Sequence, residues 1–159
     1  MEQDFLKELE FLGVTARIKR LSDALFYSIK ELYVSENVDI EPGWHLVLLI
    51  LKKKKEMSMM ELASALNLSK PALTKMTRKM KQKRYVDIDT DAKDSRKKTV
   101  RLSEKARSML PGFEQIWNAG RKAVREMLEE NEHFMSALDE FEKQHAEKSF
   151  SARALQHLK

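Results

Sequence analysis

The chain has 159 residues, a formal net charge of +5, 42% hydrophobic residues and 35% charged residues. This composition excludes a disordered or membrane-spanning chain, and the length suits one compact domain with extensions. Because the chain has no cysteine, disulfides, thiolate catalysis and thiol redox sensing are excluded. The four scattered glycines form no phosphate-binding loop and the four histidines have no metal-ligand spacing, so we expect no enzyme active site, metal or cofactor.

The charge is unevenly distributed. The first ten residues are acidic where a secretion signal would be basic, so we expect a cytoplasmic protein. Residues 69–107 carry 14 basic and 5 acidic side chains, a local balance of +9, whereas the remaining 120 residues have a balance of −4. Such a stretch suits a polyanion, although charge alone leaves open a merely solvated face.

The N-terminal region is predicted to be a long amphipathic helix. Apolar residues recur at spacings of three and four from Val14 to Leu32, and the apolar residues of the segment Phe5–Leu12 are expected to extend this helix. Its apolar face is longer than a small domain can cover, which favours contact with another chain; packing within the monomer is the alternative.

A second, buried helix is expected after a break over residues 37–42. Pro42 is placed in its first turn, where the missing N–H is tolerated. The segment Trp44–Leu51 is apolar nearly all round, and Lys52–Lys55 follow at the helix C-terminus, where cations are favoured.

Two short helices follow in a helix-turn-helix pattern. Ser58 and Glu61 fit a capping box, and Ser69 is a good N-cap for a basic helix that ends near Gln82. The inward faces are predicted to consist of Met59, Leu62, Ala63, Leu66, Ala72, Leu73, Met76 and Met80. A basic second helix is typical of a helix-turn-helix that binds DNA.

The periodicity then changes from helical to alternating. Alternation over Val86–Thr90 and again at Val100–Leu102 predicts two strands, with Asp91–Lys98 as a charged turn between them. A two-stranded hairpin after a helix-turn-helix is a wing. We therefore predict a mainly α fold with a small two-stranded β wing, a winged helix-turn-helix core and long N- and C-terminal dimerisation helices.

The C-terminal part is predicted to be helical. Ser103 caps a helix that Pro111 and Gly112 are expected to kink, and an apolar stripe continues over Phe113–Leu128. A last helix is expected over Asn131–Phe141, followed by a loosely held tail over His145–Lys159.

These elements, in this order, resemble the MarR family of bacterial transcription regulators over residues 9–141. The specific signals are Glu61-Leu-Ala-x-x-Leu-x-Leu-Ser69 in the first helix and turn, and Asp91-x-x-Asp-x-Arg-x-x-x-Val-x-Leu-Ser103 in the wing. The chain departs from the family at three positions. Arg84 stands where the family usually has glycine before the wing, Ala106 replaces a common glycine, and Ser103 replaces a threonine. A residue other than glycine in a left-handed turn costs about 1 kcal/mol, so the exit turn is expected to differ.

The resemblance implies DNA binding through the recognition helix 69–82 in the major groove and the wing 86–102 in the minor groove. It assigns DNA contacts to Ser69, Lys70, Pro71, Ala72, Thr74, Lys75, Arg78, Lys79, Asp94, Arg96 and Lys97. Arg96 would reach the minor groove from the wing tip, with Asp94 orienting its guanidinium. The alternative is that Asp94 and Arg96 form an ion pair that stabilises the wing without touching DNA.

The resemblance also implies a homodimer on a pseudo-palindromic operator and, in many members, release of DNA by a small aromatic effector. The expected dimerisation residues are Val14, Ile18, Leu21, Leu25, Phe113, Ile116, Trp117 and Val124. The candidate effector pocket contains Tyr27, Tyr33, Trp44 and His45, although a buried aromatic residue is more often part of a core.

The expected organisation is an N-terminal dimerisation helix (1–36), a winged helix-turn-helix (40–107) and C-terminal dimerisation helices with a tail (108–159). The predicted function is that of a dimeric, ligand-responsive repressor that is not an enzyme. Two alternatives stay open: a regulatory module of a larger protein, such as an acetyltransferase fusion, and a winged helix that binds only proteins.

Overall fold

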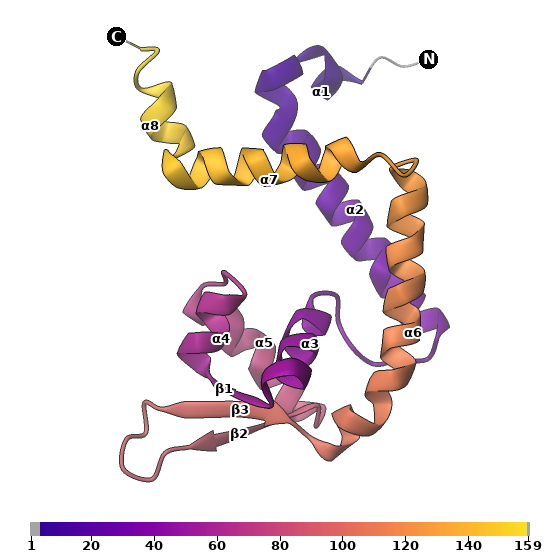
Figure 1. Cartoon of the computed structure of the whole chain (residues 1–159), viewed down its shortest axis with the longest axis vertical. Helices are drawn as coiled ribbons and strands as arrows, with labels where there is room; N and C mark the ends of the chain where they lie inside the picture. Colours follow the sequence, from indigo (N-terminus) through magenta and orange to yellow (C-terminus); the bar gives the residue numbers. More distant parts are fainter. Residues whose placement is uncertain (1–3, 159) are drawn as a thin grey trace. The chain divides into compact units, whose positions relative to one another are not determined.

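The structure, a computed structural model, describes residues 4–158 and divides the chain into two compact units, residues 1–112 and 113–159. Both are largely helical, and one small sheet lies in the first unit (Figure 1). The boundary falls within helix α6 (Glu104–Met127). The mainly α architecture with a wing is confirmed, while the division into three functional parts stays a prediction.

The N-terminal helix is interrupted. Helix α2 (Val14–Ser35) confirms the predicted stripe, but α1 (Phe5–Glu8) and a 3-10 turn, η1 (Glu10–Gly13), precede it. A continuous extension toward Phe5 is therefore wrong, because Glu10 adopts a left-handed conformation with φ of 46° that no α-helix accommodates. The Arg20 guanidinium donates to the Asp4 carboxylate at 2.7 and 3.1 Å and fastens α1 to α2.

Helix α3 (Trp44–Lys54) begins after Gly43, which has a left-handed φ of 90°. Because Gly43 separates Pro42 from the helix, the placement of Pro42 in the first helical turn is wrong. The helix is also not buried all round. Its inner face of Trp44, Val47, Leu48 and Leu51 is buried, whereas Leu46 and Leu49 on the other face are exposed.

The sheet has three antiparallel strands in the order β1-β3-β2: β1 (Glu56–Ser58), β2 (Val86–Thr90) and β3 (Lys98–Leu102). The predicted hairpin of β2 and β3 is confirmed, with Ile88 opposite Val100. On its other side Val100 faces Met57 of β1, a strand that the two-stranded prediction omits. Three residues are too few to show alternation, so pairing with a distant strand decides the conformation of β1.

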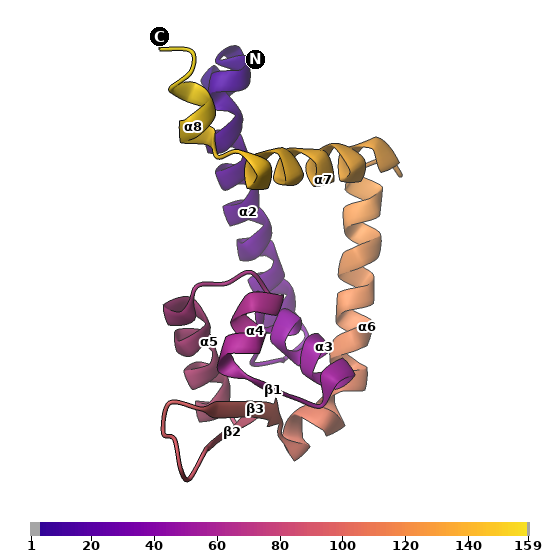
Figure 2. The ribbon, with the colours of Figure 1, turned by 60° about the vertical axis from the view of Figure 1, so that its left-hand side comes forward.

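Helices α4 (Met59–Ala65) and α5 (Lys70–Gln82) complete the core of the first unit. Leu62, Leu73 and Met80 are buried with the inner face of α3 and the apolar side of the sheet. Ala72 is exposed, so its predicted inward position is wrong; Thr77 takes an inward place instead, and its hydroxyl donates to the Leu73 carbonyl at 2.9 Å. In Figures 1 and 2 the β2–β3 hairpin projects beyond these helices.

The second unit contains the later part of α6, helix α7 (Glu132–Glu147) and helix α8 (Phe150–Ala154). Helix α6 continues through Pro111. The last predicted helix is confirmed, and Asn131 caps it, because its side chain accepts the His133 N–H at 3.0 Å. The expected boundaries are wrong beyond Phe141, where α7 continues to Glu147 and Ser149 caps α8. Within residues 4–158, no helix combines the length and apolar content that crossing a bilayer requires.

Candidate nucleic-acid interface

The first helix of the helix-turn-helix is fixed by the predicted capping box. The Ser58 hydroxyl accepts the Glu61 N–H at 3.2 Å, and the Glu61 carboxylate accepts the Ser58 N–H at 2.8 Å. These hydrogen bonds with Ser58 hold the pKa of Glu61 below its usual value. The turn after α4 passes through Asn67, which has a left-handed φ of 50° that asparagine tolerates.

Helix α5 begins at its predicted cap. The Ser69 hydroxyl accepts the Ala72 N–H at 3.3 Å, and Pro71 lies in the first turn, where no N–H is needed. The buried face of the helix is formed by Leu73, Thr77 and Met80. All the α5 positions predicted to contact DNA are exposed: Ser69, Lys70, Pro71, Ala72, Thr74, Lys75, Arg78 and Lys79.

The exposed face of α5 is not uniform. At about 100° per residue, Lys75 and Arg78 lie opposite the buried face, and within residues 4–158 neither has an ion pair. Lys79 lies at the edge of this face, and its ammonium is 3.1 Å from both carboxylate oxygens of Glu41. The exposed face of α5 therefore has two cations without an ion pair at its centre and one ion-paired cation at its edge.

The wing tip is shaped by its aspartates. The Asp91 carboxylate accepts the N–H groups of Lys93 and Asp94 at 2.7 and 3.0 Å, and the Asp94 carboxylate accepts the Arg96 N–H at 3.0 Å. The expected contact between Asp94 and the Arg96 guanidinium is not made, because the carboxylate is used by the backbone of the turn. Arg96 and Lys97 are both exposed at the tip.

The body of the wing has its own ion pairs. Arg101 on β3 contacts Asp89 on β2 and lies 3.9 Å from Asp87. These carboxylates neutralise Arg101, so the uncompensated positive charge of the wing is concentrated at the tip.

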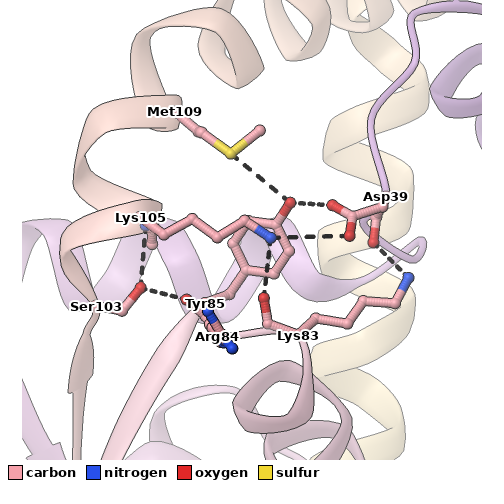
Figure 3. A network of polar contacts seen from close by, with 8 residues as sticks. Asp39, Lys83, Arg84, Tyr85, Ser103, Lys105 and Met109 are labelled. Carbon is pink, nitrogen blue, oxygen red and sulfur yellow. Dashed lines mark hydrogen bonds and ion pairs between the residues drawn. The ribbon is translucent and has the colours of Figure 1, made fainter.

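The junction between α5, the wing and α6 contains the departures from the resemblance. Arg84 has a left-handed φ of 61°, and its carbonyl accepts the Ser103 hydroxyl at 2.5 Å (Figure 3). The same hydroxyl oxygen accepts the Ala106 N–H at 3.1 Å, which confirms the predicted cap of α6. Arg84 therefore occupies the turn in which a glycine was expected, and Ser103 ties that turn to α6.

Tyr85 links this junction to the segment between α2 and α3. Its hydroxyl donates to the Asp39 carboxylate (Figure 3). Its ring lies edge-on to the Trp44 ring, with centroids 5.9 Å apart. Burial, followed by the neighbouring Asp39 carboxylate, raises the pKa of Tyr85 above its ordinary value. The spacing of residues could not have identified this contact, because the partners are 46 positions apart.

The four candidate effector residues have different environments. Tyr33 and Trp44 are buried, Trp44 as part of the core beside Tyr85. His45 is half-buried, and Tyr27 is exposed on α2. Only Tyr27 and His45 are therefore accessible from solvent.

The candidate dimerisation residues also differ. On α2, Ile18 and Leu21 are exposed by 49% and 56%, while Val14 and Leu25 are half-buried. On α6, Val124 is exposed, Ile116 and Trp117 are half-buried, and Phe113 is buried with its ring centroid 5.8 Å from that of Trp117. The α2 stripe thus leaves large apolar side chains in contact with water.

The comparisons with known proteins agree with this geometry. The model of the MarR family matches residues 38–97, which contain the helix-turn-helix and most of the wing. The helix-turn-helix and most of the wing are therefore similar to the MarR family. No curated protein sequence matches the chain significantly.

Solved structures resemble the chain over most of its length. A single-site mutant of MarR from E. coli complexed with operator DNA is 20% identical, with a TM-score of 0.67 over 89% of this chain and 98% of that one. The repressor CouR bound to a 23-mer DNA duplex is 20% identical, with a TM-score of 0.69 over 92% and 99%. The regulator BldR from Sulfolobus solfataricus is 24% identical, with a TM-score of 0.59 over 91% and 99%. At these identities the likeness shows the fold.

Proposed function

We propose that the chain is a transcription regulator of the MarR family that binds double-stranded DNA. The observation that carries this proposal is a group of exposed cations without an ion pair within residues 4–158, among them Lys75 and Arg78 on the outward face of α5 and Arg96 at the wing tip. A helix fits the major groove, and lysine and arginine there contact guanine edges or phosphates. The DNA complexes of E. coli MarR and CouR, which share the fold, support the proposal.

Recognition of the DNA sequence is assigned to the N-terminal half of α5. Short side chains at the start of a recognition helix reach base edges, and the exposed residues there are Ser69, Lys70, Pro71, Ala72 and Thr74. Thr74 donates its hydroxyl to the Lys70 carbonyl at 2.8 Å, which leaves the hydroxyl oxygen able to accept from a base. Lys75 directly follows Thr74, and Arg78 lies about one turn after Thr74.

The wing is assigned to the adjacent minor groove. Narrow minor grooves attract arginine, and the exposed side chain of Arg96 stands on a turn that Asp91 and Asp94 hold in shape. Lys97 adds a phosphate contact. Asp94 then contributes by fixing the backbone from which Arg96 extends.

The regulator is proposed to act as a homodimer on a pseudo-palindromic operator. Two recognition helices would contact half-sites about 34 Å apart, one helical turn of DNA. The exposed apolar stripe of α2 supports this assembly, since such a stripe gains most from a second copy. The C-terminal dimerisation residues are carried over from the resemblance.

Regulation is proposed to be repression relieved by a small aromatic effector. An effector releases DNA only if it binds the conformation that does not fit the operator more tightly than the conformation that does. Tyr27 and His45 are the candidate residues that such a molecule could reach directly, whereas Tyr33 and Trp44 are buried.

Fluorescence anisotropy of a labelled duplex from the region upstream of the chain's own gene tests the proposal. Arg96→Ala is expected to weaken binding to all sequences, while Lys75→Ala and Arg78→Ala also change the sequence preference, each by about 1–3 kcal/mol if a guanine contact is lost. Lys30→Ala, the same change on α2, is the control and should bind as the wild type does.

The dependence on salt decides the outcome. A slope of several in the plot of log K against log salt concentration supports binding to DNA phosphates. Equal affinity for a scrambled duplex would reject sequence-specific recognition. No binding to either duplex at low salt, or no effect of all three variants, would reject the DNA-binding assignment and favour a winged helix that binds proteins.

A further inference from the structure

The segment between α2 and α3, residues 36–43, is held firmly at both ends. Asn37 and Gly43 adopt left-handed conformations with φ of 55° and 90°, and the Val38 N–H donates to the Tyr33 carbonyl at 2.9 Å. Between them the Ile40 side chain is 5% exposed. This linker therefore has a defined path across the DNA-recognition region, and two of its three acidic side chains, Asp39 and Glu41, lie between the left-handed residues.

Asp39 contacts the junction of three elements (Figure 3). Its backbone carbonyl accepts the Lys83 ammonium, at the end of α5, at 2.7 Å. Its carboxylate accepts the hydroxyl of Tyr85, which directly precedes β2, and lies 3.8 Å from the Lys105 ammonium on α6. Asp39 thus makes hydrogen bonds to the end of the recognition helix and to the base of the wing, and an ion pair with the start of α6.

The two lysines around Asp39 are themselves part of a closed network. Lys105 also donates to the Lys83 carbonyl at 3.0 Å, and its ammonium lies 4.1 Å from the centroid of the Tyr85 ring. The Lys83 ammonium lies 5.7 Å from the centroid of the Trp44 ring. Both cations are oriented by several groups at once, so they are structural parts of the junction.

Glu41 makes the second attachment, to α5 itself. Its two carboxylate oxygens are each 3.1 Å from the Lys79 ammonium. Lys79 is four residues after Lys75, which rotates it about 40° around the helix, toward the linker. The sequence assigns Lys79 to DNA together with Lys75, but the structure distinguishes the two: Glu41 neutralises Lys79, and no carboxylate within residues 4–158 neutralises Lys75.

We infer that the α2–α3 linker is the positioning element of the DNA-recognition region. Asp39 and Glu41 are its positioning residues, and Lys79 is held by Glu41 instead of by phosphate. The inference rests on the proposed DNA binding. It adds that the linker determines how many cations of α5 can contact DNA phosphates. Displacing the linker would release Lys79 from Glu41 and would remove the contacts of Asp39 at the base of the wing.

The salt dependence of DNA binding tests the role of Glu41. Each phosphate contact contributes about 0.9 to the slope of log K against log salt concentration. Lys75→Gln is therefore expected to reduce the slope by about 0.9, whereas Lys79→Gln should leave it unchanged. Glu41→Gln should increase the slope by about 0.9, and the double variant Glu41→Gln with Lys79→Gln should return it to the wild-type value. Glu41→Asp, which keeps the carboxylate, should preserve the wild-type slope.

Glu36→Gln is the matched control, because it removes the same charge from an exposed linker residue that has no ion pair within residues 4–158. It should not change the slope. A loss of slope in Lys79→Gln equal to that in Lys75→Gln, or an increase in Glu36→Gln equal to that in Glu41→Gln, would overturn the inference.

A measurement without DNA separates failure of this inference from failure of the proposed function. In amide proton–nitrogen spectra, Asp39→Asn should shift the resonances of Arg84, Tyr85 and Lys105 and those of β2, while Glu36→Gln shifts only its neighbours. Shifts confined to the linker in Asp39→Asn would overturn the positioning role. If the spectra behave as expected but wild-type protein binds no DNA, the linker role stands as a structural one and the DNA-binding proposal fails.

Discussion

At the scale of single residues, Arg84 shows a backbone conformation that its side chain disfavours. A β-carbon in the left-handed region meets its own backbone, and only glycine avoids the cost. Arg84→Gly is therefore expected to raise the free energy of unfolding, by about 1 kcal/mol, in urea denaturation. The Ser103 hydroxyl would keep its acceptor, because that acceptor is the backbone carbonyl of residue 84. Arg84→Ala is the control, since it removes the charge and keeps the β-carbon; an equal gain in both variants would refute the explanation.

His45 links the stability of the first unit to pH. Burial lowers its pKa from the ordinary 6.5, so between the two pKa values the unfolded chain binds more protons than the folded one. The contribution of neutral His45 to the free energy of unfolding is then fully present above about pH 6.5. It is lost as the pH falls through the pKa of His45 in the folded state. Denaturation midpoints measured from pH 7.5 to 5 should fall, and less steeply in His45→Gln. His133→Gln, on an exposed position of α7, should keep the wild-type slope; an unchanged slope in His45→Gln would contradict the prediction.

At the scale of elements, local chemistry predicts the helix starts well. Ser58, Ser69 and Ser103 each accept an N–H from the first turn that follows, as predicted. The alternation of apolar and polar residues predicts the two strands of the hairpin equally well. Both the cap spacing and the alternation involve residues that are close in the chain. The expectation that Arg84 would change the exit turn is not met, because Arg84 adopts the left-handed φ of 61° that glycine favours.

The elements and contacts that sequence reasoning misses depend on distant partners. Strand β1 is decided by pairing with β3, and Asp39 by groups of three other elements. The division of cations on α5 into paired and unpaired depends on Glu41, 38 positions before Lys79. Composition predicts that residues 69–107 are basic, but only the folded chain identifies which charges are already neutralised.

At the scale of the whole molecule, the exposed apolar stripe of α2 leads us to expect an interface with a second copy of the chain. Ile18 and Leu21 lie on one side of the helix with Val14 and Leu25, and burying apolar surface gains about 25 cal/mol per Å². Since a stable interface buries roughly 1,600 Å² in total, this stripe can supply a large part of one between two copies. Both the oligomeric state and the thermal stability should then depend on protein concentration.

A charge placed on the stripe tests this assembly. Leu21→Glu should shift the protein from dimer to monomer in sedimentation velocity at micromolar concentration, because a dimer would bury an unpaired carboxylate from each copy. Its Tm should also become independent of concentration, since unfolding no longer includes dissociation. Ala16→Glu introduces the same side chain at an exposed position about 140° away around the same helix, five residues before Leu21. That variant should remain a dimer. Dissociation by both variants would indicate a general effect on α2, and a wild-type monomer would exclude α2 as the interface and leave the pseudo-palindromic operator without a physical basis.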